Sequence, residues 1–169
     1  MALVSIFLNF NMNRTAYLIL GFSLFALFVL QDVLGWNWVF LETLQQDQMY
    51  RRWSGLVLSM VILFQWLLTL VRSVPRWEEK TFTFYNIHNW LGALSPLLFY
   101  VHSTQLGFAY LFLLSVTFFG NFILGMFNLD VIKQKAMWIF QGWMILHVSF
   151  SFFITFLTLF HVWIVFYYE

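Results

Sequence analysis

The sequence predicts an all-α integral membrane protein, a bundle of five transmembrane helices with the N-terminus inside and the C-terminus outside. Of the 169 residues, 62% are hydrophobic and only 9% are charged, too few polar groups to cover a soluble surface. Apolar stretches of about 20 residues, the length that a helix needs to cross a bilayer core, occur five times. The distribution of Lys and Arg along the chain predicts how the helices are oriented in the membrane.

The five apolar stretches lie near 16–34, 54–72, 83–103, 105–127 and 137–166. A polar connection over 32–52 separates the first two, and a connection over 72–80 with Pro75 follows the second. A short turn over 103–105 precedes the fourth stretch, and a polar connection over 128–135 precedes the fifth. None of these connections is long enough to fold as a soluble domain, so we expect residues 1–169 to form a single transmembrane domain.

Basic residues predict the orientation, because the cytoplasmic loops of membrane proteins are enriched in Lys and Arg. With a cytoplasmic N-terminus, six of the eight basic residues lie inside: Arg14, Arg72, Arg76, Lys80, Lys133 and Lys135. Only Arg51 and Arg52 then lie outside. We expect the prokaryotic inner (cytoplasmic) membrane as the location. A net charge of +1 gives no basic excess that would indicate a nucleic-acid partner.

The four histidines form two pairs with identical spacing. His88 and His102 are 14 residues apart, and so are His147 and His161. On an α-helix this spacing keeps both members on one face, about 40° and about 21 Å apart. The third and fifth helices run parallel, so His88 is expected opposite His147 on the inner side, and His102 opposite His161 on the outer side. Imidazoles inside membrane helices are costly and usually functional.

Two imidazoles at each level predict two haem b groups, with His88 and His147 on the inner iron and His102 and His161 on the outer iron. No carboxylate or third ligand accompanies the histidines, so a pair fits the two axial positions of a haem better than a tetrahedral site. Iron with both axial positions filled favours electron transfer over chemistry at the metal. The chain has no cysteine, which excludes thiolate-held iron–sulfur clusters and covalently attached haem.

Other residues on the histidine faces are candidate cofactor contacts. Gly92 and Ser151 are placed to leave room for a porphyrin, although small residues also let membrane helices pack closely. Ser95 and Thr158 lie on the same faces. Pro96 is expected to bend its helix, with the Ser95 hydroxyl satisfying a freed carbonyl.

Basic and amide side chains are further candidates. Haem propionates need donors, and by position these are Arg51 and Arg52 outside and Arg72, Arg76 and Lys80 inside. The alternative is that these residues only follow the charge bias and anchor the helix ends. Two amides inside the expected spans, Gln65 and Asn121, either join helices or face a cofactor.

The His-x13-His pattern on two helices resembles the di-haem membrane cytochromes b. With ligands on the third and fifth helices, it is most similar to the ferric reductase-like transmembrane domain of ferric reductases, NADPH oxidases and the haem subunit of the bacterial methionine sulfoxide reductase system. The cytochrome b of quinol-oxidising bc complexes has similar spacing but carries its ligands on the second and fourth helices. The resemblance covers His88 to His161. We expect neither the sixth helix nor the flavin and nicotinamide domains of that family, and no Gly-x-Gly-x-x-Gly motif occurs in the sequence.

The resemblance implies that electrons arrive from a quinol or a separate donor subunit. We therefore expect a di-haem cytochrome subunit that conducts electrons between a quinone pool or inner donor and an outer-face redox partner. It would be an electron-transfer subunit of an oxidoreductase complex, with other redox subunits and the lipid bilayer as partners. Two alternatives stay open: a quinol dehydrogenase membrane anchor with its own quinone site, and a haem-free structural or metal-transport subunit.

Overall fold

The computed structural model describes residues 14–36, 38–127 and 137–168. All regular structure in these ranges is helical, which confirms the all-α prediction for this part of the chain. Most of the connection expected over 128–135, with Lys133 and Lys135, lies outside the described residues. The helices are α2 (Arg14–Leu34), α3 (Val39–Gln46), α4 (Gln48–Phe64), α5 (Leu67–Ser73), the 3-10 helix η1 (Pro75–Lys80), α6 (Thr81–His102), α7 (Tyr110–Met126) and α8 (Met137–Tyr168).

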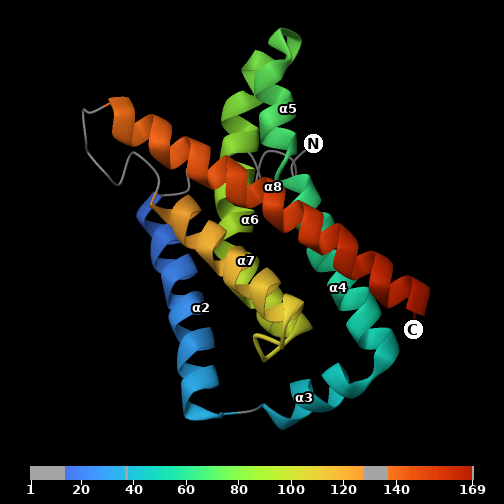
Figure 1. Cartoon of the computed structure of the whole chain (residues 1–169). Coiled ribbons are helices and arrows are strands. Elements are labelled where there is room, and N and C mark those ends of the chain that lie inside the picture. The colour runs from blue at the N-terminus through green and yellow to red at the C-terminus, as the bar shows by residue number, and fades with distance from the viewer. Residues whose placement is uncertain (1–13, 37, 128–136, 169) are drawn as a thin grey trace, which may run out of the picture.

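The long helices alternate in direction along the chain (Figure 1). In this view α2, α6 and α8 run downward, whereas α4 with α5 and α7 run upward, and α3 lies across the lower end. α8 crosses the other helices obliquely. α2 packs mainly against α6, and α7 packs mainly against α8.

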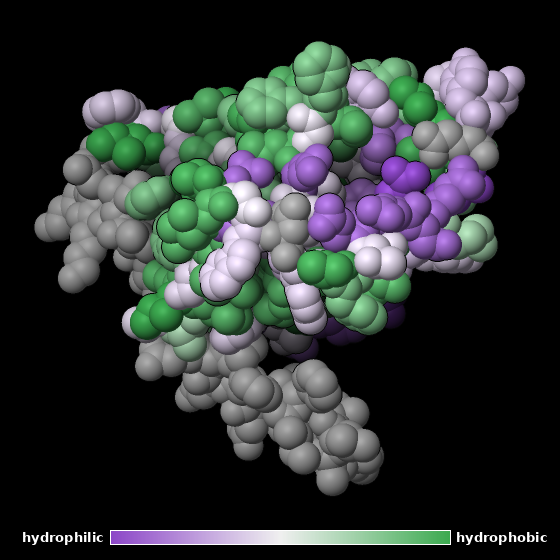
Figure 2. All heavy atoms as spheres, turned by 90° about the horizontal axis from the view of Figure 1, so that it is seen from below, coloured by the Kyte–Doolittle hydropathy of each residue, from purple (hydrophilic) through white to green (hydrophobic). Residues whose placement is uncertain are grey.

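Three helical segments of the described chain are long and apolar enough to cross a membrane, judged by length and composition. They are Thr15–Leu34, Gln48–Ser73 and Met137–Tyr168, the first, second and fifth of the expected spans. α7 is apolar but has only 17 residues, and α6 has 22 residues that include several polar side chains. Seen from below, polar side chains gather on the side where α3 and the start of α4 lie (Figure 2). The five-span arrangement and its orientation remain predictions.

The connection expected over 32–52 contains regular structure. It holds α3 and the first turn of α4, separated by Asp47. The Asp47 carboxylate accepts a hydrogen bond from the Tyr50 backbone N–H at 2.7 Å, the usual role of an aspartate at a helix N-cap. α4 therefore starts at Gln48, and the second apolar segment is longer than expected.

The turn before α7 is also longer than the expected 103–105. Gly107 has a φ of 77° and Ala109 a φ of 54°, both outside the helical region. A helix cannot continue through left-handed residues, so α7 begins at Tyr110 rather than at 105.

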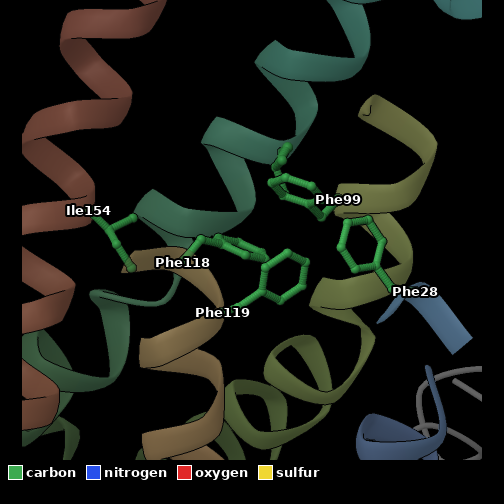
Figure 3. Packing of buried hydrophobic residues seen from close by; sticks show 6 residues of the cluster. Phe28, Phe99, Phe118, Phe119 and Ile154 are labelled. Carbon is green, nitrogen blue, oxygen red and sulfur yellow. The ribbon is translucent and has the colours of Figure 1, made fainter. Parts of the chain in front are cut away.

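A cluster of aromatic side chains fills the centre of the bundle (Figure 3). Its buried members are Phe28 of α2, Leu58 of α4, Phe99 of α6, Phe118 and Phe119 of α7, and Ile154 of α8. The Phe119 ring centroid lies 4.7 Å from that of Phe28 and 4.8 Å from that of Phe99. Phe99 lies between the two histidines of α6 in the sequence, and Ile154 lies between the two of α8. The cluster therefore packs between the two histidine levels.

Pro96 is fully buried, and α6 continues through it. Proline has no N–H, so the carbonyl of Gly92, four residues earlier, loses its helical donor. The Ser95 hydroxyl donates to the Gly92 carbonyl at 2.7 Å. This hydrogen bond confirms that the Ser95 hydroxyl satisfies the carbonyl freed by Pro96. The role of Ser95 as a cofactor contact stays a prediction.

Candidate functional site

The four histidines come together in the two pairs that their spacing predicts. The ring centroids of His88 and His147 are 6.2 Å apart, and those of His102 and His161 are 6.4 Å apart. Each pair consists of one histidine from α6 and one from α8. The ring planes meet at 79° in the first pair and at 67° in the second.

These separations fit two axial ligands of one iron. An imidazole nitrogen binds a first-row metal at about 2.0 Å and lies about 1.2 Å from its ring centroid, so two such rings have centroids about 6.4 Å apart. Aromatic rings in direct contact cover the same range of distances. Distance alone therefore does not distinguish a metal site from a direct contact between the rings, and the polar atoms around the rings have to be considered as well.

At the inner pair, the Nδ1 atoms of His88 and His147 are buried and make no well-directed hydrogen bond to the described residues. The backbone groups that act on these rings belong to Gln65 for His88 and to Asn121 for His147. Trp143 stacks on His147 with centroids 5.8 Å apart and ring planes at 2°. The Trp143 Nε1 donates to the Leu124 carbonyl at 2.8 Å, which fixes this stack on α7.

The inner pair lines a cavity of about 550 Å³ between α4, α5, α6, α7 and α8. Cofactor and ligand pockets range over about 300–1,000 Å³. Besides the two histidines, the residues named from the sequence that line it are Gln65, Arg72, Gly92, Ser95, Asn121 and Ser151. A Cβ on Gly92 would meet only the Gln65 Nε2, at 3.9 Å. The room predicted beside Gly92 is therefore present.

Amide side chains give the cavity its polar atoms. The Gln65 Oε1 and the Asn89 Nδ2 are buried and lack a hydrogen-bond partner in the described chain. The Gln65 Nε2 donates to the His88 carbonyl at 3.3 Å. The Asn121 Nδ2 donates to the Ser151 Oγ at 3.0 Å. Asn121 thus joins α7 to α8, one of the two roles that the sequence left open, and it also lines the cavity.

At the outer pair, each Nδ1 atom lies beside a hydroxyl. The Ser54 Oγ of α4 is 3.1 Å from the His102 Nδ1, and the Tyr110 hydroxyl of α7 is 3.3 Å from the His161 Nδ1. Metal-bound histidines usually hydrogen-bond through the ring nitrogen that does not bind the metal. A hydroxyl on Nδ1 therefore orients both rings for binding through Nε2.

Glycines let neighbouring helices approach two of the histidines. A Cβ on Gly55 would lie 2.8 Å from the His102 Cε1, and one on Gly125 would lie 3.3 Å from the His147 Cε1. Sequence reasoning missed Gly55, Gly125, Ser54 and Tyr110. Adjacent small residues at Ser54 and Gly55 were the one signal of a close approach.

The candidate propionate donors differ in their surroundings. Arg52 is half-buried, and its Nε and Nη2 have no hydrogen-bond partner within the described ranges. Its guanidinium carbon lies 6.0 Å from the Phe166 ring centroid. Arg72 lines the inner cavity and is exposed, as are Arg51 and Arg76. The charge of Arg72 acts on His88 and that of Arg51 on His102, so Arg72 at the inner level and Arg51 with Arg52 at the outer level are placed to receive an anionic group.

Thr158 is the last of the predicted contacts. It is buried in α8, and its Oγ1 makes no hydrogen bond to any residue that the structure describes. In the same part of the chain, no three or more His, Asp or Glu side chains gather as a possible metal site. The histidines thus stand as two separate pairs.

No family model matches this chain, and neither the curated proteins nor the solved structures include a detectable relative of it.

Proposed function

We propose that this chain is a di-haem b-type cytochrome subunit that conducts electrons across a membrane. One observation carries the proposal: α6 and α8 bring four histidines together as two pairs, each at the spacing of two axial ligands of one iron. His88 and His147 would hold the inner haem, and His102 and His161 the outer haem. The haems supply one-electron redox chemistry, and the protein supplies their position and surroundings.

The remaining site residues have supporting roles in this proposal. Trp143 holds the His147 ring, while Ser54 and Tyr110 orient the outer rings through their hydroxyls. Arg72 at the inner level and Arg51 with Arg52 at the outer level would provide positive charge for propionates. Because the two histidines of each pair would both be ligands of its iron, no coordination position would be left for a substrate, which favours electron transfer over a reaction at the metal.

The membrane setting belongs to the same proposal. The supports are three apolar helical segments of sufficient length and the uneven distribution of basic residues. The N-terminus would be cytoplasmic, in a prokaryotic inner membrane. Electrons would pass between a quinone pool or an inner donor subunit and a redox partner at the outer face.

A quinone site within this chain is a second candidate, favoured by the two unpartnered amides of the inner cavity. The Gln65 Oε1 can accept a hydrogen bond from a quinol hydroxyl, and the Asn89 Nδ2 can donate to a quinone carbonyl. Reduction of the purified subunit by quinol, lost in Gln65→Leu with haem content intact, would support this site.

The deciding experiment is a reduced-minus-oxidised spectrum with pyridine haemochrome quantitation on the purified protein. We expect about two low-spin haems per chain, and about one after either His88→Ala or His102→Ala. Gln141→Ala, which changes an exposed polar residue of α8, should retain both haems. A colourless protein that is indifferent to both histidine substitutions would reject the cytochrome and favour the haem-free structural or metal-transport alternative.

A further inference from the structure

Gln45, at the end of α3, binds the last turn of α6 through both ends of its amide. The Gln45 Nε2 donates to the carbonyls of Tyr100 at 2.8 Å and of Val101 at 3.1 Å. The Gln45 Oε1 accepts from the Thr104 backbone N–H at 3.3 Å and from the Thr104 Oγ1 at 3.1 Å. These contacts lie on both sides of His102, the last residue of α6.

The end of α6 needs such partners. The last carbonyls of a helix have no donor within the helix, and Tyr100 and Val101 belong to this final turn. The Tyr50 hydroxyl also donates to the Val101 carbonyl, at 3.0 Å. A flipped Gln45 amide would turn its oxygen toward two carbonyl oxygens, so the contacts select one orientation.

The same corner of the chain also contacts the His102 ring. Asp47 ends α3 and caps α4, which sets the direction in which α4 leaves the corner. Ser54, further along α4, lies 3.1 Å from the His102 Nδ1. The α3–α4 corner, residues 45–54, therefore contacts both the backbone around His102 and its side chain.

The inner histidine of α6 is held differently. His88 lies inside α6, well past its start at Thr81 and far from its end. Hydrogen bonds within the helix therefore hold the His88 backbone without help from α3. A change at Gln45 should reach the outer pair and leave the inner pair unaffected.

We propose that Gln45 is a positioning residue for the outer haem, holding His102 opposite His161 by fixing the last turn of α6. The proposal rests on the proposed cytochrome function. Gln45 acts through the end of α6, because its amide hydrogen bonds join it to Tyr100, Val101 and Thr104.

The test compares Gln45→Leu with Gln46→Leu, which changes the exposed neighbour on the same helix. The measured quantity is the rate of haem transfer from the purified protein to excess apomyoglobin, with the outer haem assigned as the one that His102→Ala removes. Gln45→Leu should release the outer haem about tenfold faster, the lower end of the effect of removing an outer-shell partner. The release of the inner haem, and both rates in Gln46→Leu, should match the wild type.

Amide hydrogen exchange gives a readout that needs no haem. Exchange over residues 100–106 should accelerate in Gln45→Leu, because the Thr104 N–H loses its acceptor. Thr104→Val is a milder variant that removes only the hydroxyl contact, and it should shift the outer haem in the same direction. It serves if Gln45→Leu does not fold.

Three outcomes would overturn the proposal. Unchanged release of the outer haem in both Gln45→Leu and Thr104→Val would show that the contacts do not position His102. Equal acceleration for both haems would mean general destabilisation. A wild-type protein without haem would reject the proposed function and this inference together, whereas a wild-type protein with two haems that are unaffected by both Gln45→Leu and Thr104→Val would reject only the inference.

Discussion

Gly55 occupies the tightest contact of the outer pair. A Cβ at this position would lie 2.8 Å from the His102 Cε1, too close for a carbon–carbon contact. Gly55→Ala should therefore displace the His102 ring or α4, and the outer haem should be lost while the inner haem remains. Pyridine haemochrome quantitation on the purified variant measures this.

Gly142→Ala is the matched control, because a Cβ there meets nothing within 4 Å. It should retain both haems, and it should raise the stability of α8 by about 0.5–1 kcal/mol, since alanine favours a helix over glycine. If Gly55→Ala kept both haems with unchanged spectra, the close approach of α4 to His102 would be wrong.

At the scale of residues, the sequence predicted the histidine pairs but not their neighbours. The spacing of His88 and His102 is local information, because one helix fixes both positions. The contacts of Ser54 and Tyr110 with the histidines join residues far apart in the chain. They depend on how the helices pack, and neither hydroxyl has a sequence pattern of its own.

The pairing of α7 with α8 depends in part on a polar contact inside an apolar bundle. The Asn121 Nδ2 donates to the Ser151 Oγ at 3.0 Å. A double-mutant cycle with Asn121→Ala and Ser151→Ala should give a coupling of about 0.6 kcal/mol, the mean for hydrogen bonds between membrane helices, and at most about 1.7 kcal/mol. Unfolding of the four proteins in detergent measures it, and strictly additive effects would show that this hydrogen bond adds no stability.

At the scale of elements, the apolar stretches predicted the position of the long helices, whereas the short features were missed. α3 has eight residues and lies in a polar segment, so it carries no span-length signal. The break between α4 and α5 falls at Gln65 and Trp66, neither of which is a helix breaker. Trp66 donates from its Nε1 to the Thr155 Oγ1 at 2.9 Å, a contact with α8 that only the folded chain provides.

For the whole molecule, the orientation can be tested directly because the chain has no cysteine. α3 and η1 lie at opposite ends of the structure (Figure 1). Gln46→Cys and Glu79→Cys each place a single thiol at one of these exposed ends. In intact cells, a membrane-impermeant maleimide should label Gln46→Cys and not Glu79→Cys, because the basic residues near η1 favour the cytoplasm.

After permeabilisation both variants should be labelled, which controls for the reactivity of each thiol. Labelling of Glu79→Cys alone in intact cells would reverse the orientation, and labelling of both would reject a spanning arrangement between these two ends.

Large apolar side chains on the sides of the bundle are exposed, with Leu27 at 62% and Phe152 at 69%. In a membrane protein, we expect lipid or partner subunits to cover these sides, because such large apolar surfaces are unfavourable in contact with water.

The angle between the rings of each histidine pair has a further consequence. The planes meet at 79° in the inner pair and 67° in the outer pair, so they are nearer to perpendicular than to parallel. In the proposed cytochrome, rings held near these angles would interact with different dπ orbitals of a ferric iron and keep those orbitals close in energy. The g tensor of each iron would then be strongly anisotropic. The orientation of the histidine rings, set by the packing of α6 and α8 around them, would in that case determine the magnetic properties of the site.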